Sequence, residues 1–220
     1  MTTKFRVLRG ERLELYSPIG LNPIDDVTGA APIGWVRAEL DLKVGANWSK
    51  TSIKDARSAS GIIIYPALGR QVEVQGQLPR RYRVRITAQF YIAWYRQNLD
   101  GIEFDAFPYN DAIPPQVIVS QANALPLSPA VNYPFPGHIA VLRGVVADTA
   151  GNRIKDVEVK RGAVERVLTD ERGTFALPLR WTANNVSVSI DATDHRTNRT
   201  GTINVTLPQD LRKSQTIVIN

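Results

Sequence analysis

Apolar and polar residues alternate at a period of two through both halves of this chain, and the 3.6-residue period of an amphipathic helix is nearly missing. The longest alternating run extends from Arg81 to Arg96. One face of this run carries Tyr82, Val84, Ile86, Ala88, Phe90, Ile92 and Trp94. Because successive side chains of a strand point to opposite faces of the sheet, the pattern predicts a half-buried strand. We therefore expect an all-β protein.

Shorter alternating runs, separated by turn residues, predict the other strands. In the first half these runs are 12–16, 35–42, 61–65 and 71–74. In the second half they are 139–147, 156–160, 165–169, 174–177, 186–191, 200–207 and 215–219. Short strands spaced by about 8–15 residues are typical of β-sandwiches.

Proline density indicates how the chain is divided. Seven of the fourteen prolines lie in the segment 108–136. Since proline lacks an N–H group and restricts the residue before it, no strand ladder is expected there. Apolar residues such as Leu125 and Leu127 alternate with these prolines, which predicts an extended segment packed on a neighbouring surface. The sequence thus predicts a first sandwich over 1–107, a docked Pro-rich linker over 108–136 and a second sandwich over 137–220.

A weak internal repeat relates the two halves. Asp26-Val-Thr-Gly29 matches Asp148-Thr-Ala-Gly151, and the segment 58–61 matches the segment 170–173. In each motif an Asp or Ser opens a turn by accepting backbone hydrogen bonds, and a glycine closes it at positive φ. Two copies of one sandwich topology explain the match, and so does chance recurrence of short turn motifs.

Residue types limit the chemistry of this protein. The 220 residues include no cysteine and two histidines, His138 and His195. Disulfides, thiol nucleophiles and His-rich or thiolate metal sites are therefore excluded. We expect His195 on a surface loop, since no nucleophile is marked beside it, and His138 at the domain junction.

The residues give little support to a calcium site or to a phosphate-binding site. A calcium site would need to gather Asp148, Asp170, Asp191 and Asp194, but turn capping accounts for the first two. No glycine-rich phosphate-binding motif occurs. We therefore expect no catalytic residue, no metal and no cofactor.

Charge and hydropathy bear on partners and location. The net charge of +6 is spread over both halves, so nucleic acid is not the expected partner. The apolar runs are too short to span a bilayer, and charges interrupt the region where a secretion signal needs an apolar core. Residence in a cytoplasm, away from membranes, is the expectation.

Positive charge is concentrated on one face of the long predicted strand, in the row Arg81, Arg83 and Arg85. Planar guanidinium groups suit carboxylates, so an acidic protein partner is one interpretation and a solvated sheet face is the other. Trp181, in a loop after a predicted strand, is the tryptophan expected to contact a partner. These four residues are the candidate partner-binding set.

Two stretches of the second half carry a resemblance. They are 142–159, LRGVVADTAGNRIKDVEV, and 167–177, VLTDERGTFAL. They resemble the carboxypeptidase regulatory-like, transthyretin-like family of seven-stranded sandwiches, departing from its pattern at Arg153 and at Lys155-Asp156. The resemblance covers about 80 residues and implies the fold class: all-β, with two tandem Ig-like or transthyretin-like β-sandwich domains joined by the docked linker.

The whole arrangement is similar to structural proteins of phage tails and contractile injection particles. The features compared are the turn motifs, the Arg-Tyr-Arg-Val strand and the run from Tyr133 to Gly144. This similarity implies a non-enzymatic adaptor, cap or baseplate component, assembled in the bacterial cytoplasm as a homo-oligomeric ring with tube, sheath, neck or baseplate proteins. The alternative is a monomeric carbohydrate- or cell-surface-binding module, which would need exposed aromatic side chains among Tyr91, Tyr95 and Trp181.

Overall fold

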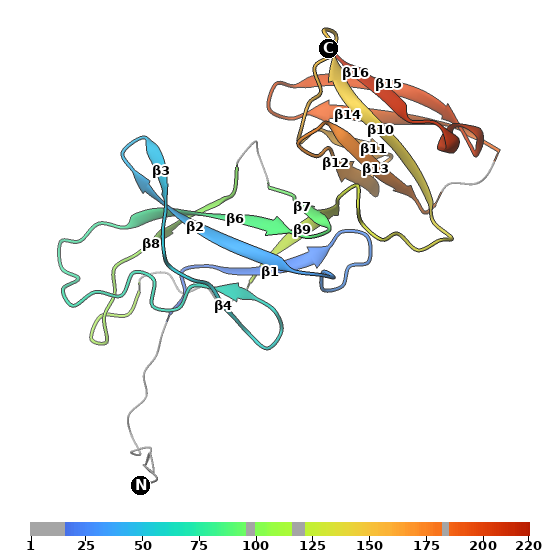
Figure 1. Ribbon diagram of the computed structural model, residues 1–220. Helices are drawn as coiled ribbons and strands as arrows, with labels where there is room; N and C mark the ends of the chain where they lie inside the picture. The colour runs from blue at the N-terminus through green and yellow to red at the C-terminus, as the bar shows by residue number, and fades with distance from the viewer. Residues whose placement is uncertain (1–15, 96–99, 116–121, 182–184) are drawn as a thin grey trace.

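Two β-sandwiches make up the part of the chain that the structure, a computed structural model, describes: residues 16–95, 100–115, 122–181 and 185–220 (Figure 1). No α-helix occurs in these residues, and the 3-10 turn η1 (Gln209–Arg212) is their helical element. The all-β class and the β-sandwich architecture are confirmed. The predicted strand over 12–16 lies almost entirely outside the described residues.

The first sandwich consists of two sheets. Its strands are β1 (Gly20–Asp25), β2 (Val36–Val44), β3 (Asn47–Lys50), β4 (Ala56–Arg57), β5 (Ile63–Ile64), β6 (Arg80–Ala88), β7 (Tyr91–Ala93), β8 (Ile102–Ala106) and β9 (Asn123–Pro129). One sheet has the order β4-β5-β1-β9-β7, and the other has the order β3-β2-β6-β8.

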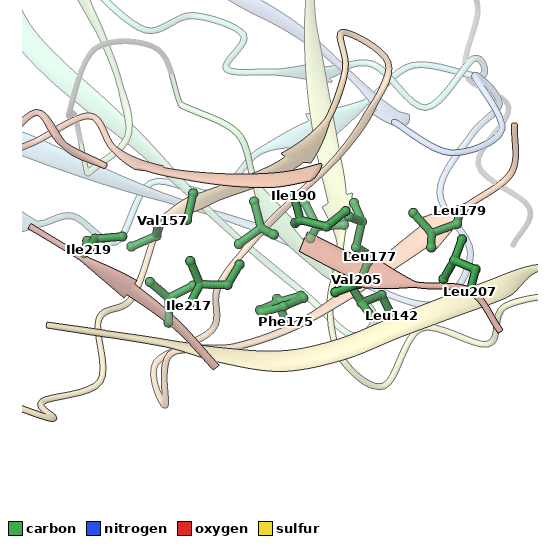
Figure 2. Close-up of a cluster of buried hydrophobic side chains, with 14 residues drawn as sticks. Leu142, Val157, Phe175, Leu177, Leu179, Ile190, Val205, Leu207, Ile217 and Ile219 are labelled. Carbon is green, nitrogen blue, oxygen red and sulfur yellow. The ribbon is translucent and has the colours of Figure 1, made fainter. Parts of the chain in front are cut away.

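The second sandwich contains all seven strands predicted for it. They are β10 (Ala140–Asp148), β11 (Glu158–Arg161), β12 (Glu165–Leu168), β13 (Thr174–Leu179), β14 (Ser187–Asp194), β15 (Arg199–Thr206) and β16 (Gln215–Ile219). The sheets are β13-β10-β16 and β12-β11-β14-β15. Apolar side chains from both sheets, Phe175, Ile190 and Ile217 among them, fill the space between the layers (Figure 2).

The two sandwiches share one topology. In chain order, β1, β2, β3, β5, β6, β8 and β9 correspond to β10, β11, β12, β13, β14, β15 and β16. In each sandwich the first strand pairs antiparallel with the fourth of these seven and parallel with the last. The weak sequence repeat therefore marks two copies of one fold, and β4 and β7 are additions at the two edges of one sheet in the first copy.

The repeated turns have the predicted chemistry, with one correction. The carboxylate of Asp148 accepts the N–H groups of Ala150 and Asn152, and Gly151 has a φ of 85°. In the first copy the capping residue is Asp25 instead of Asp26, because its Oδ1 accepts the N–H groups of Val27 and Thr28. The first turn is one residue longer, so the capping position shifts by one residue.

The predicted linker contains a strand, which corrects the expectation that proline density excludes one. β9 pairs in parallel with β1 and antiparallel with β7, so it closes the first sandwich and extends this sandwich beyond residue 107. Both prolines pair within these ladders, Pro126 opposite Ile24 of β1 and Pro129 opposite Tyr91 of β7. A proline has no N–H to donate, but its carbonyl still accepts, and the carbonyl of Pro126 accepts the N–H of Trp94, one residue past the end of β7.

The long strand predicted from Arg81 to Arg96 is wrong as one element. β6 ends at Ala88, the chain bends at Gln89 and Phe90, and β7 continues in the other sheet. The bend changes which residues face the core, so Tyr91 becomes buried. The strand predicted over 71–74 is absent, because this segment forms an exposed loop.

Candidate functional site

The predicted arginine row lies on the outer face of the sheet β3-β2-β6-β8, as expected, but the chain supplies its acidic partners. Neighbouring strands place carboxylates beside β6: Arg85 lies opposite Glu39 and Arg83 opposite Asp41 on β2. On the other side, Arg81 lies opposite Asp105 on β8. The row is therefore flanked by acidic residues on both sides.

Asp41 is the centre of this network. Its carboxylate accepts hydrogen bonds from Arg83 Nη2 at 2.9 Å and from Arg85 Nε at 2.8 Å, and the residue is only 2% exposed. Burial raises the pKa of Asp41 and hydrogen bonds from Arg85 and Arg83 lower it; the hydrogen bonds prevail, so the pKa lies below its ordinary value.

At the exposed end of the row, Arg81 binds two carboxylates. Its guanidinium lies 3.0 Å from Glu103 and 3.3 Å from Asp105. An acidic partner would have to compete with these carboxylates of the chain itself. The predicted partner-binding role of Arg81, Arg83 and Arg85 stays a prediction, and the geometry gives them a structural role.

A second group of contacts joins the two sandwiches. Arg166 of β12 forms an ion pair with Asp26 at 3.2 Å and lies 4.4 Å above the ring of Trp94. The buried hydroxyl of Ser128 in β9 accepts the N–H of Leu168 at 3.0 Å. β12 therefore packs on the same sheet of the first sandwich that contains β7 and β9.

The turn after β1 is part of this junction. The guanidinium of Arg180 donates to the carbonyl of Val27. Below the turn, the buried carboxylate of Asp25 accepts the hydroxyls of Tyr133 at 2.8 Å and of Tyr91 at 3.1 Å. The turn that contacts the second sandwich is thus anchored in the core of the first.

An open cleft of about 1120 Å³, lined by both charged and apolar residues, lies between the sandwiches. On its second-sandwich wall, His195 Nε2 lies 2.5 Å from Glu158 Oε2, and Arg196 pairs with Asp156 at 2.8 Å. Arg196 also reaches Asp100 of the first sandwich at 3.3 Å. His195 is half-exposed, as predicted, but its partner Glu158 was missed because the pairing depends on the register between β11 and β14.

Candidate metal ligands do not gather in the described residues. No cluster of three or more His, Asp or Glu side chains there could hold a metal ion. Asp148 and Asp170 each cap their own turn, and Asp194 binds Thr197 and Arg199 in a third turn. The carboxylate of Asp191 accepts the hydroxyl of Thr202. The four carboxylates of the candidate calcium site are thus engaged separately.

The aromatic residues differ from the expectations. Tyr91 is 4% exposed and Tyr95 is partly buried with its hydroxyl on the backbone of Ile86, so neither presents a free ring face. Trp94 is the tryptophan at the domain junction, while Trp48 lies on the outer sheet face against Arg83.

Trp181 is 71% exposed at the end of β13, next to the turn between β11 and β12. The backbone N–H of Trp181 donates to Glu165 Oε1 at 2.8 Å. Arg161 donates to the other oxygen of the same carboxylate at 2.9 Å. Val164, which directly precedes Glu165, is 64% exposed. The exposed Val164 thus directly precedes the buried Glu165 in sequence, and the exposed Trp181 is joined to Glu165 through its backbone N–H.

Fold and site together define an all-β protein of two sandwiches with one topology, joined through a polar interface. No protein-family model matches the chain, and no curated protein matches it. A solved structure described as "The Bacillus anthracis TIE protein" is similar at a TM-score of 0.29 and 12% identity, over 93% of this chain and 33% of that one. The chain thus spans about a third of that protein's length. Among the described residues, no helix has the length and apolar character needed to cross a membrane.

Proposed function

We propose that this protein is a non-enzymatic structural adaptor of a phage tail or contractile injection particle. In this role it acts through protein–protein interfaces, and its two sandwiches hold partner proteins at a fixed mutual angle. The particle is suggested by the resemblance of the sequence, and the adaptor role is supported by the junction between the sandwiches.

The observation that carries the proposal is the number of independent contacts at that junction. Three contacts join the second sandwich to the first: the ion pair Arg166–Asp26, the buried hydrogen bond from Leu168 to Ser128, and the bond from Arg180 to the Val27 carbonyl. The carbohydrate-binding alternative keeps one of its three candidate aromatic residues: Tyr91 and Tyr95 are not available for stacking, whereas Trp181 is 71% exposed.

The experiment is a mass measurement on the native protein, followed by recovery from its source. Light scattering of the purified 24.4 kDa chain is expected to give a multiple of this mass, and affinity recovery from the source lysate is expected to bring tube, sheath, neck or baseplate proteins. A monomer that recovers no particle protein and is retained on a glycan array would contradict the adaptor role.

A further inference from the structure

Exposed side chains at the end of the second sandwich combine apolar surface with positive charge. Trp181 and Val164 supply the apolar part. The nearby cations are Arg161 at the end of β11, Arg166 in β12 and Arg180 directly after β13. We call Trp181, Val164 and Arg180, with the turn 161–165, the Trp181 surface.

Two acidic residues of this region, Glu165 and Asp26, are already engaged by arginines of the chain. The side chain of Glu165 is 0% exposed, because it is covered while it binds Arg161 and the N–H of Trp181. Asp26 is engaged by Arg166. A molecule approaching the Trp181 surface therefore meets cations and apolar groups.

The charge of Arg180 is not neutralised within the part of the chain that the structure describes. Its Nη1 donates to a carbonyl, that of Val27, and its buried Nε has no hydrogen-bond partner. No carboxylate among the described residues pairs with Arg180. A partly buried guanidinium without a counter-charge is costly. A partner carboxylate that pairs with the exposed part of Arg180 would offset part of that cost, while the buried Nε stays out of its reach.

The arginines of β6 make a useful contrast. Asp41, Glu39, Glu103 and Asp105 already neutralise that row, so it gives an acidic partner little to gain. The uncompensated charge of Arg180 lies in sequence directly beside the most exposed aromatic residue of the described chain. Aromatic residues and arginine are the side chains that most often dominate the energy of protein interfaces.

From these observations we infer that the Trp181 surface binds an acidic polypeptide segment of a partner protein. A partner carboxylate pairs with Arg180, and an apolar side chain of the same segment covers Trp181 and Val164. The inference rests on the proposed function only in taking the partner to be a protein. It moves the acid-binding surface from the arginine row to the second sandwich.

The test uses two synthetic twelve-residue peptides, one in which Asp and Leu alternate with Gly-Ser spacers and one with Lys in place of Asp. Binding to the full chain is followed by NMR through the indole N–H signals of its four tryptophans, with Trp181 assigned from the Trp181→Phe variant. The acidic peptide is expected to shift the Trp181 signal selectively. Its affinity is expected to fall several-fold when salt is raised from about 0.05 to about 0.3 M, because charge attraction is screened.

Two variants define the surface and one is a control. Trp181→Ser is expected to weaken binding by about tenfold. Arg180→Gln, which keeps a donor for the Val27 carbonyl, is expected to weaken it several-fold. Leu78→Ser alters an 80% exposed aliphatic residue of the first sandwich and is expected to leave binding unchanged. Retained NMR dispersion verifies that each variant is folded.

Equal binding of the two peptides, full affinity in Trp181→Ser, or no binding at millimolar peptide would overturn the inference. These outcomes are separable from failure of the adaptor role. An oligomer that recovers particle proteins yet ignores the acidic peptide contradicts the inference alone. A monomer without particle partners that binds the acidic peptide at Trp181 contradicts the adaptor role alone.

Discussion

Asp41 shows how a single buried carboxylate organises an exposed sheet face. It lies under the arginine row and binds two guanidinium groups, so the row behaves as a set of cross-strand ion pairs. Its effect on stability depends on burial, since exposed pairs contribute little. The ion pairs of Arg81 with Glu103 and Asp105 are more exposed and serve as the comparison with those of Asp41.

Replacing Asp41 with Ala is expected to lower the free energy of unfolding by about 3 kcal/mol, because Arg83 is left partly buried without its counter-charge. Asp105→Ala, at the exposed end of the row, is expected to cost less than about 1 kcal/mol. Urea denaturation of both variants makes the comparison. Equal effects of the two changes would show that burial of Asp41 does not matter.

The stability should also depend on pH through Asp41. Its folded pKa lies below the unfolded value of 3.8, so its contribution is complete above that pH and is lost as the pH falls through the folded pKa. Between pH 5 and pH 2, unfolding free energies of the wild type should therefore fall more steeply than those of Asp41→Asn. Parallel curves for the two proteins would refute this assignment.

At the scale of elements, β9 decides where the first sandwich ends. It lies between β1 and β7 in the sheet and contributes the buried side chains of Leu125 and Leu127. The corresponding strand of the second sandwich, β16, has the same parallel partner position. A sandwich without this last strand would expose β1 and part of its core.

A fragment covering residues 1–107 is therefore expected to be unfolded, while a fragment covering 1–137 is expected to unfold cooperatively on heating. Circular dichroism and one-dimensional NMR distinguish the two states. If the shorter fragment shows the same cooperative transition as the longer one, β9 is dispensable and the boundary predicted at residue 107 was adequate.

At the scale of the whole molecule, the mutual angle of the sandwiches depends on the turn after β1. Asp25 anchors this turn in the first core, and Asp26 and Val27 contact the second sandwich. Because the chain has no cysteine, single labels can be attached at introduced cysteines without interference.

With spin labels at positions 60 and 206, the double variant Arg166→Ala with Arg180→Ala is expected to broaden the distance distribution between the sandwiches. The two substitutions remove the ion pair to Asp26 and the bond to the Val27 carbonyl. Arg172→Ala, at an exposed turn of the second sandwich, serves as control. An unchanged distribution in the double variant would show that the remaining contacts set the angle.

Local alternation and turn chemistry were sufficient to predict much of this fold. The seven strands of the second sandwich, the Asp- and Ser-capped turns and the outward direction of the arginine row all depend on residues close in sequence. The turn repeat also marked the duplicated topology, because the same turns follow the first strand and precede the fourth strand of each copy.

Long-range pairing decided the rest. Whether β9 tolerates its prolines depends on which backbone groups of β1 and β7 lie opposite them. Whether Arg81, Arg83 and Arg85 are available depends on which carboxylates β2 and β8 place beside them. The uncompensated charge of Arg180 likewise follows from the docking of one sandwich on the other. The sequence by itself determined the strands and turns, because these depend on neighbouring residues. Strand register and domain contacts bring distant residues together, so only the tertiary structure decided which charges are neutralised.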